Sequence, residues 1–228
     1  MTEPRIVLVH GWGFGPEFWA PVVARLPGRA ISVADLGFYG QEGDMAVEPL
    51  RAFCQGGGPV LAVGHSLGFL LLATQVELPK GSFLAGINAF GRFAAGPDFS
   101  AGVAPRLLAR MMRGLEQTPL RVVNDFRARC GASSLPEQTA LNAPALASGL
   151  TLLCEGEARA TLADMAGRMA VLAGENDPVV PKAMTVASLP KFVACRWSEG
   201  GHLLPQTAPE TCATFVARCH QTMRKIAV

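Results

Sequence analysis

A serine between two glycines is the residue of this chain best suited to nucleophilic chemistry. The pentapeptide Gly64-His65-Ser66-Leu67-Gly68 follows an apolar run of strand length and precedes an apolar run of helical length. A strand that turns directly into a helix leaves no space for side chains two residues either side of the serine. We expect this turn to strain Ser66, expose its hydroxyl, and place the Leu67 amide where it stabilises an anion. The alternative is a structural turn with an inert serine.

A serine hydroxyl becomes a nucleophile only when a base takes its proton. Where a serine stands at such a turn, the chain order is serine, acid, histidine, and only His202 and His220 follow Ser66. His202 comes just after the last strand-like run, so we predict that it is the base. His220 lies inside the last helical run and is expected at the surface. The two earlier histidines, His10 and His65, are expected to shape backbone or line the pocket.

The carboxylate that orients the base is predicted to be Asp177. It lies in a proline-flanked loop after a strand-like run, at the edge of the sheet where Ser66 should emerge. Glu175, two residues closer to the strand, is the rival. A purely structural role for Asp177, as a helix cap before Pro178 and Pro181, is the remaining alternative.

A glycine-rich loop follows the first strand-like run and reads His10-Gly11-Trp12-Gly13-Phe14-Gly15. Such a loop lets the backbone approach a substrate oxygen closely, so we predict that the Trp12 amide is a second oxyanion donor beside that of Leu67. A turn with a stacking aromatic and a nucleotide-binding loop are the alternatives. The spacing of the glycines matches neither G-x-G-x-x-G nor a P-loop.

Apolar runs of strand length alternate with helical patterns along most of the chain. The predicted strands span residues 5–10, 30–35, 59–64, 83–88, 169–174 and 192–197. The predicted helices span residues 16–26, 42–54, 67–78, 181–188 and 209–225. Continuous apolar strands separated by helices predict a parallel sheet with helices on both faces.

Residues 91–167 interrupt this alternation, because they show apolar residues at helical spacing and no clear strand. We therefore predict an α/β fold whose mostly parallel sheet has about six strands. Its core comprises residues 1–90 and 168–228, and residues 91–167 form a helical cap insertion.

Composition excludes several classes of protein. Half of the 228 residues are apolar and 17% are charged, which is unlike a disordered chain. The net charge of +2 without a basic run argues against nucleic-acid binding, and the longest uncharged apolar run argues against a membrane span. Residues 1–5 do not read as a signal peptide, and six unclustered cysteines read as free thiols of a cytoplasmic protein. No ligand spacing for a metal is present, and no cofactor is expected.

These segments resemble the α/β-hydrolase family. The resemblance rests on the glycine-rich loop, the serine pentapeptide, and residues 174–181 and 201–205 around the predicted acid and base. Within the family the likeness is greatest to the carboxylesterases that hydrolyse pimeloyl-acyl-carrier-protein methyl ester in biotin synthesis. The resemblance implies the α/β-hydrolase fold and ester hydrolysis by Ser66, His202 and Asp177.

The same resemblance implies how substrate binds. Trp12, Phe126 and Arg121 correspond to substrate-binding positions, and an acyl-carrier protein is the implied partner of a basic cap. The arginines of that region are Arg106, Arg110, Arg113, Arg121, Arg127 and Arg129. An ordinary solvated helix face is the alternative. We expect a monomer that also accepts small-molecule esters.

Three features depart from the family pattern. Phe69 stands where many relatives have glycine, Asp125 stands where a basic residue is expected, and the family's first two strands have no counterpart. The departures leave open a general small-molecule hydrolase of the same fold: a short-acyl esterase, a lactonase or a carbon–carbon bond hydrolase. A non-catalytic binding protein is the third hypothesis.

Overall fold

The computed structural model describes residues 5–165 and 167–226. Residues 1–4, 166 and 227–228 lie outside the described residues. Both ends of the predicted core and residue 166 of the predicted cap are therefore not described. The same holds for residues 1–4 of the stretch considered as a signal peptide.

The sheet confirms the predicted fold class. Its six strands are all parallel and lie in the order β2-β1-β3-β4-β5-β6. The strands are β1 (Arg5–Val9), β2 (Ile31–Ala34), β3 (Val60–His65), β4 (Phe83–Ile87), β5 (Met169–Gly174) and β6 (Ala194–Ser198). Each overlaps a predicted strand, because strands buried on both faces show up as continuous apolar runs.

The register aligns the carboxyl ends of the central strands. Val9 of β1 pairs with Gly64 of β3, and His65 pairs with Ile87 of β4. The loops that follow these three strands therefore begin side by side at one edge of the sheet. Ligands of open parallel sheets bind at this edge, so it is the expected place for a site.

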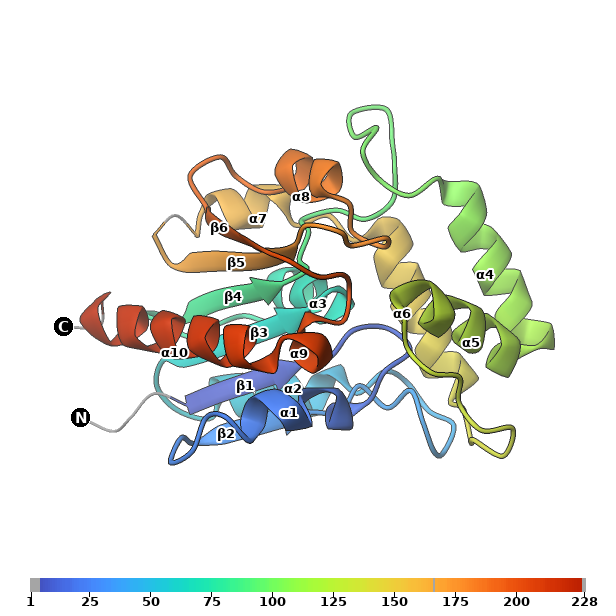
Figure 1. Ribbon diagram of the computed structural model, residues 1–228, viewed down its shortest axis with the longest axis horizontal. Helices are drawn as coiled ribbons and strands as arrows, with labels where there is room; N and C mark the ends of the chain where they lie inside the picture. Colours follow the sequence, from blue (N-terminus) through green and yellow to red (C-terminus); the bar gives the residue numbers. More distant parts are fainter. Residues whose placement is uncertain (1–4, 166, 227–228) are drawn as a thin grey trace.

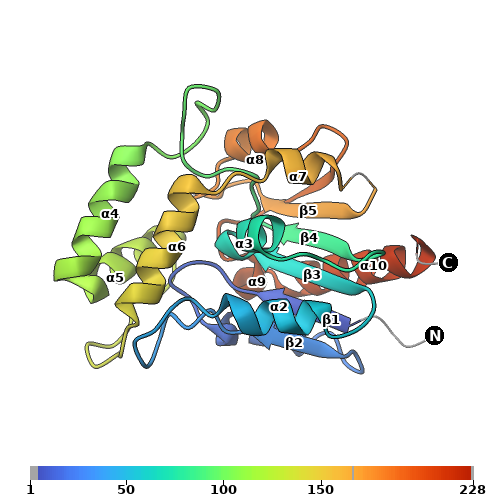
Figure 2. The same ribbon diagram turned by 180° about the vertical axis from the view of Figure 1, so that it is seen from behind.

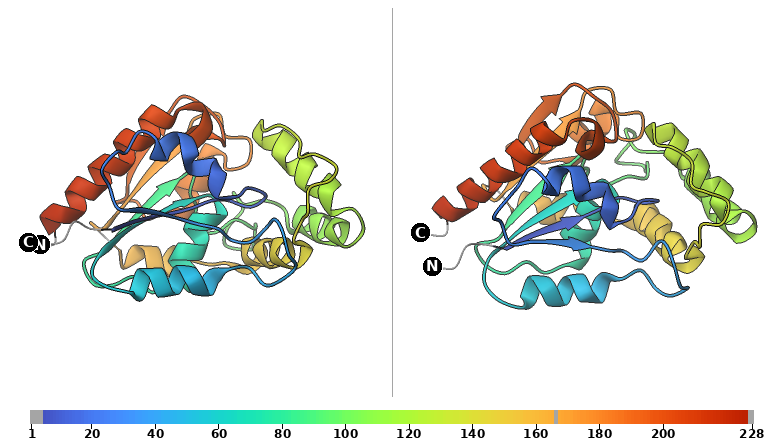
Figure 3. Two further views of the ribbon diagram at one scale, coloured as in Figure 1. Left: turned by 90° about the horizontal axis from the view of Figure 1, so that it is seen from below. Right: turned by 60° about the horizontal axis from the view of Figure 1, so that its bottom comes forward.

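Helices cover both faces of the sheet (Figures 1 and 2). On one face, α10 (Pro209–Ile226) packs against β3, β4 and β5, beside α1 (Ala20–Val23) and α9 (Leu204–Thr207). On the other face lie α2 (Val47–Gln55), α3 (Leu67–Gln75) and α7 (Arg159–Ala163) (Figure 3). The short α8 (Lys182–Ser188) packs beside β5.

Two predicted helices are shorter than expected. The helix predicted over residues 16–26 is a 3-10 turn, η1 (Pro16–Trp19), followed by α1, because the prolines at 16 and 21 permit only first-turn positions. The helix predicted over 42–54 begins only at Val47, since the Gly43 amide donates to Asn142 and the Ala46 amide to the Leu36 carbonyl.

Three helices lie beyond the carboxyl ends of the strands, away from both chain ends (Figure 1). They are α4 (Pro105–Gln117), α5 (Pro119–Cys130) and α6 (Ala143–Glu155), and they arise from the stretch that was predicted to lack strands. Helix α4 packs against α5 and α6, while α6 also packs on α3 of the core. We refer to α4, α5 and α6 as the cap helices, and their role as a cap remains a prediction.

One histidine was placed wrongly from the sequence. His220 was expected at the surface, but it is buried, and Arg29 Nη1 donates to its Nδ1 at 2.8 Å. The error arises because His220 lies on the same stripe of α10 as Ala213, Val216 and Met223, which faces the sheet.

Two further findings concern the chain as a whole. Within residues 5–165 and 167–226, no helix is both long and apolar enough to span a membrane. All six cysteines are free. Burial raises the pKa of Cys54 and Cys195 to about 11 and that of Cys130, Cys212 and Cys219 to about 12, and it also raises the pKa of Cys154 above its usual value. None of these thiols is poised as a thiolate nucleophile.

Candidate active site

Ser66 stands in a strained turn between β3 and α3. Its backbone has φ +53° and ψ −119°, and a positive φ is rare for a residue with a side chain. A Cβ at Gly64 would overlap the backbone of Phe69, and a Cβ at Gly68 would overlap the carbonyl oxygen of Val9. The two glycines are therefore required by close packing, as the sequence predicts.

His202 and Asp177 form a buried hydrogen-bonded pair. Nδ1 of His202 lies 2.8 Å from Oδ2 of Asp177, and each side chain is 1% exposed. The other carboxylate oxygen, Oδ1, accepts hydrogen bonds of 2.8 Å from the amides of Val179 and Val180. Because a carboxylate only accepts, the neutral imidazole carries its proton on Nδ1 and has its lone pair on Nε2.

The structure separates the two acid candidates. Glu175 is exposed, and only its backbone amide is bonded nearby, to the Ser198 carbonyl. Asp177 is the carboxylate that reaches the imidazole. The two-residue difference matters because the chain turns at Asn176, whose amide donates to the Gly200 carbonyl.

Nε2 of His202 is buried and, among the described residues, has no hydrogen-bond partner. Ser66, which is 4% exposed, therefore makes no hydrogen bond with the imidazole in this structure. Both residues lie around His65: its ring centroid is 4.7 Å from that of His202, and Ser66 follows it in the chain. In unliganded sites the bond between nucleophile and base is often long and tightens when substrate is bound.

The glycine-rich loop approaches the serine closely. A Cβ at Gly11 would lie 2.7 Å from His65 Nδ1 and 3.2 Å from Ser66 Cβ, so only glycine fits. Trp12 is buried, and neither its amide nor that of Leu67 donates a hydrogen bond within the described part of the chain. A buried amide without a partner is uncommon, and two of them near a serine can receive an oxyanion.

His10 shapes this loop, as the sequence analysis expected. Its ring bonds to the carbonyl of Gly11 at 3.0 Å through Nδ1 and accepts from the Leu36 amide at 3.0 Å through Nε2. Interaction with the His10 side chain, whose Nε2 lies 3.7 Å from Asp35 Oδ1, lowers the pKa of Asp35, against the opposing effect of partial burial.

Of the predicted substrate-binding residues on α5, Phe126 lies near the predicted triad and Arg121 lies at the surface. The Phe126 ring of α5 stands edge-on to the rings of Trp12 and His202, with centroid separations of 5.0 and 6.3 Å, so it lies next to the predicted base. Arg121, in contrast, is 80% exposed and pairs with Asp125 on the same helix at 3.9 Å. The structure therefore brings Phe126, but not Arg121, to the predicted triad.

Two of the arginines that the sequence assigns to a basic surface also anchor α5 to the core. Arg127 donates to the Gly13 carbonyl at 3.1 Å and covers the Phe14 ring. Arg129 donates to the Pro178 carbonyl at 3.1 and 3.3 Å, next to Asp177. The Trp12 indole adds a third link, at 2.8 Å to the Leu146 carbonyl of α6. These links were missed because their acceptors are backbone oxygens far away in the sequence.

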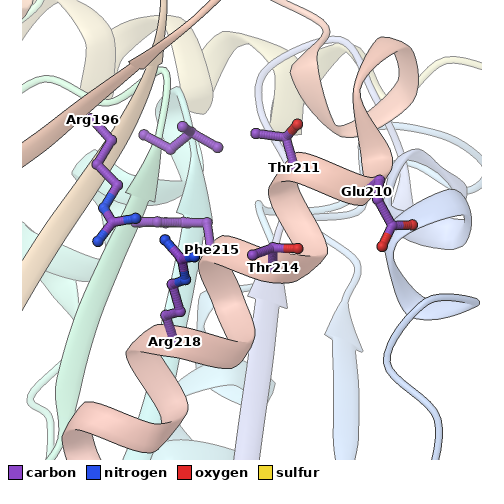
Figure 4. A pocket seen from close by; sticks show the side chains of 7 residues that line it. Arg196, Glu210, Thr211, Thr214, Phe215 and Arg218 are labelled. Atoms are coloured by element: carbon purple, nitrogen blue, oxygen red, sulfur yellow. The ribbon is translucent and has the colours of Figure 1, made fainter.

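A groove between β6 and α10 is separate from this site (Figure 4). It has a volume of about 220 Å³ and contains Arg196 and Arg218 around Phe215. Glu210, at its end, pairs with Arg25 at 3.1 Å. No residue of the predicted triad lines this groove, and the described residues contain no group of three potential ligands that could hold a metal ion.

The parallel sheet, the strained serine turn and the buried acid–histidine pair define the class of α/β hydrolases. A family model described as "Alpha/beta hydrolase family" matches residues 6–215, so the chain belongs to this family. Its members' active sites lie on loops at the carboxyl edge of the sheet, where Ser66, Asp177 and His202 are found here.

Curated relatives are similar over most of the chain. A pimeloyl-acyl-carrier-protein methyl ester esterase of Xanthomonas axonopodis pv. citri (strain 306) is 33% identical over 222 residues, which covers 87% of this chain and 88% of the relative. One from Pectobacterium carotovorum subsp. carotovorum (strain PC1) is 30% identical over 201 residues, 78% of this chain and 77% of the relative.

A solved structure shows the same fold. The esterase from Exiguobacterium antarcticum superposes with a TM-score of 0.75, at 15% identity, over 96% of this chain and 92% of that chain. At this identity the likeness concerns the fold alone.

Proposed function

We propose that the protein is a serine carboxylesterase in which Ser66 is the nucleophile, His202 the base and Asp177 the residue that orients the base. The observation that carries the proposal is the buried bond between Asp177 and His202, at the sheet edge where the strained Ser66 turn also ends. That bond keeps the proton on Nδ1 and leaves Nε2 able to accept another.

The reaction follows from these positions. The Ser66 hydroxyl attacks the ester carbonyl while Nε2 of His202 takes its proton, and the amides of Trp12 and Leu67 stabilise the oxyanion. The imidazolium then returns the proton to the departing alkoxide, which leaves as the alcohol. Water, deprotonated by His202, cleaves the acyl-enzyme and restores Ser66.

The proposed substrate is the methyl ester of a pimeloyl group carried on an acyl-carrier protein, with methanol as the released alcohol. The support is the similarity to esterases of that description and a basic stripe on the outer side of α4. Arg106, Arg110 and Arg113 are exposed there, four and three residues apart, and no ion pair of theirs occurs among the described residues. Such a stripe attracts an acidic carrier protein.

Methanol release from pimeloyl-acyl-carrier-protein methyl ester tests this proposal against dimethyl pimelate as the free ester. Reversing the stripe (Arg106→Glu, Arg110→Glu and Arg113→Glu together) should raise KM for the carrier-bound ester and leave the free ester unaffected. Lys80→Glu is the control, since Lys80 is exposed and precedes the amino end of β4, at the opposite edge of the sheet. Equal kinetics of the triple variant and the wild type on the carrier-bound ester would reject the carrier.

A small-molecule hydrolase of the same fold is the second candidate, because Ser66 is only 4% exposed beneath the cap helices. A short-acyl esterase, a lactonase or a carbon–carbon bond hydrolase needs no long arm to reach a buried serine. Good turnover of free esters without methanol release from the carrier-bound ester would favour this candidate. A fluorophosphonate probe that labels the wild type no more than Ser66→Ala would reject both.

A further inference from the structure

Asn88 is a buried polar residue in a conformation that most side chains avoid. It directly follows β4, has φ +50° and is 1% exposed. Asparagine tolerates this left-handed region better than other residues with a Cβ. This strained residue lies at the same edge of the sheet as Ser66, at the end of the neighbouring strand.

The carboxamide of Asn88 makes three hydrogen bonds. Nδ2 donates to the Gly201 carbonyl at 3.0 Å and to the His202 carbonyl at 2.8 Å, while Oδ1 accepts from the Gly174 amide at 2.8 Å. Two carbonyls require a donor and one amide requires an acceptor, so the orientation of the carboxamide is fully determined. The backbone amide of Asn88 also donates to Leu172 at 2.8 Å.

These bonds join the two loops that hold the proposed acid and base. Gly174 ends β5 three residues before Asp177, and Gly201 immediately precedes His202. His65 donates through Nε2 to the same His202 carbonyl at 2.8 Å. The carbonyl of His202 is therefore held by two buried donors, while its Nδ1 bonds to Asp177.

We propose that Asn88 is a positioning residue, which acts through the His202 carbonyl to keep the imidazole against Asp177 and directed toward Ser66. The proposal rests on the proposed function. A buried carbonyl without a hydrogen-bond donor is energetically costly, so a loop that loses such a donor is expected to move until the carbonyl has another. A displacement of about 1 Å at the imidazole is enough to slow the reaction by about 100-fold.

Asn88→Asp separates positioning from simple support of the fold. The aspartate retains an acceptor for the Gly174 amide but loses both donors toward residues 201 and 202. If Asn88 only supports the end of β5, Asn88→Asp should have the kcat of the wild type per folded molecule. If Asn88 positions His202, kcat on p-nitrophenyl acetate should fall by about 10- to 100-fold with KM nearly unchanged.

The proton NMR resonance of His202 Nδ1–H is a second readout that needs no turnover. We expect Asn88→Asp to shift or broaden this resonance, because the bond to Asp177 lengthens. Asn142→Asp is the matched control: Asn142 is also buried, and its Nδ2 donates to the Gly37 carbonyl at 2.7 Å. It should lower the unfolding temperature and leave both the resonance and the kcat per folded molecule unchanged.

The outcomes distinguish the two proposals. A wild type that hydrolyses no ester, just like Ser66→Ala, rejects the proposed function, and the resonance then decides the role of Asn88. Unchanged resonance and unchanged kcat in Asn88→Asp reject that role. If Asn88→Asp does not fold, Asn88→Gly decides by the same measurements, because glycine accommodates φ +50° without strain.

Discussion

Nδ1 of His202 and Oδ2 of Asp177 lie 2.8 Å apart, although 24 residues separate the two in the chain and neither side chain reaches solvent appreciably. The pair is held on both sides. Two loop amides bind the second oxygen of Asp177, and Asn88 and His65 bind the carbonyl of His202. Because each of these hydrogen bonds has a defined donor and acceptor, the effect of a single substitution on the pair can be predicted.

Asp177→Asn should abolish most esterase activity through the wrong imidazole tautomer. The amides of Val179 and Val180 retain the oxygen of the new carboxamide, so its NH₂ group faces Nδ1 of His202. Nδ1 must then accept, and the proton moves to Nε2, where the base is needed. We expect kcat/KM on p-nitrophenyl acetate to fall by about 10⁴-fold. Glu175→Gln is the control, and a larger loss in that variant would identify Glu175 as the acid.

Ser66→Gly should stabilise the fold while it removes activity. Ser66 has φ +53°, which glycine adopts without the steric cost that serine and alanine bear. We expect the free energy of unfolding to be about 1 kcal/mol higher in Ser66→Gly than in Ser66→Ala. Urea unfolding of the two inactive variants measures the difference. A glycine variant no more stable than the alanine variant would show that the turn is not strained.

Phe126→Ala should discriminate between long and short acyl chains. The ring lies edge-on to Trp12 and His202, so we expect an acyl chain bound at Ser66 to contact it. Loss of this apolar contact should lower kcat/KM for p-nitrophenyl octanoate by about 10-fold and affect p-nitrophenyl acetate less. Val122→Ala is the control on the same helix, because Val122 contacts Gly114 of α4 instead. A uniform loss on both esters would contradict contact with the acyl chain.

His65 should make the stability of the protein fall in mild acid. Burial, with a smaller effect from His202, holds the pKa of His65 well below its usual value. The unfolded chain binds a proton below about pH 6.5 while the folded protein does not, so stability is complete above that pH and decreases below it. The slope contributed by this residue reaches about 1.4 kcal/mol per pH unit.

Urea unfolding between pH 5 and pH 8 measures this dependence. His65→Asn, which can still donate to the His202 carbonyl, should unfold with a weaker dependence on pH than the wild type. An identical dependence in both proteins would mean that His65 becomes protonated without unfolding.

Local sequence was sufficient to predict the six strands and to nominate residues whose side chains could do chemistry. Apolar runs marked all six strands, because a strand covered on both faces has no polar side to interrupt the run. The serine turn was readable because steric exclusion of a Cβ restricts Gly64 and Gly68 to glycine. Order along the chain left His202 and His220 as candidate bases, and the position of His202 just after the last strand-like run favoured it. The same order favoured Asp177 as the acid, with Glu175 as the rival.

Tertiary structure alone decided which side chains meet. Asp177 rather than Glu175 reaches His202, Arg127 and Arg129 bind backbone carbonyls of distant loops, and His220 is buried. Asn88 carried no signal in the sequence, since a single asparagine after a strand is common at turns. The physical reason is the same in each case: these bonds join backbone and side-chain groups from distant segments, and only the packed sheet determines their separation.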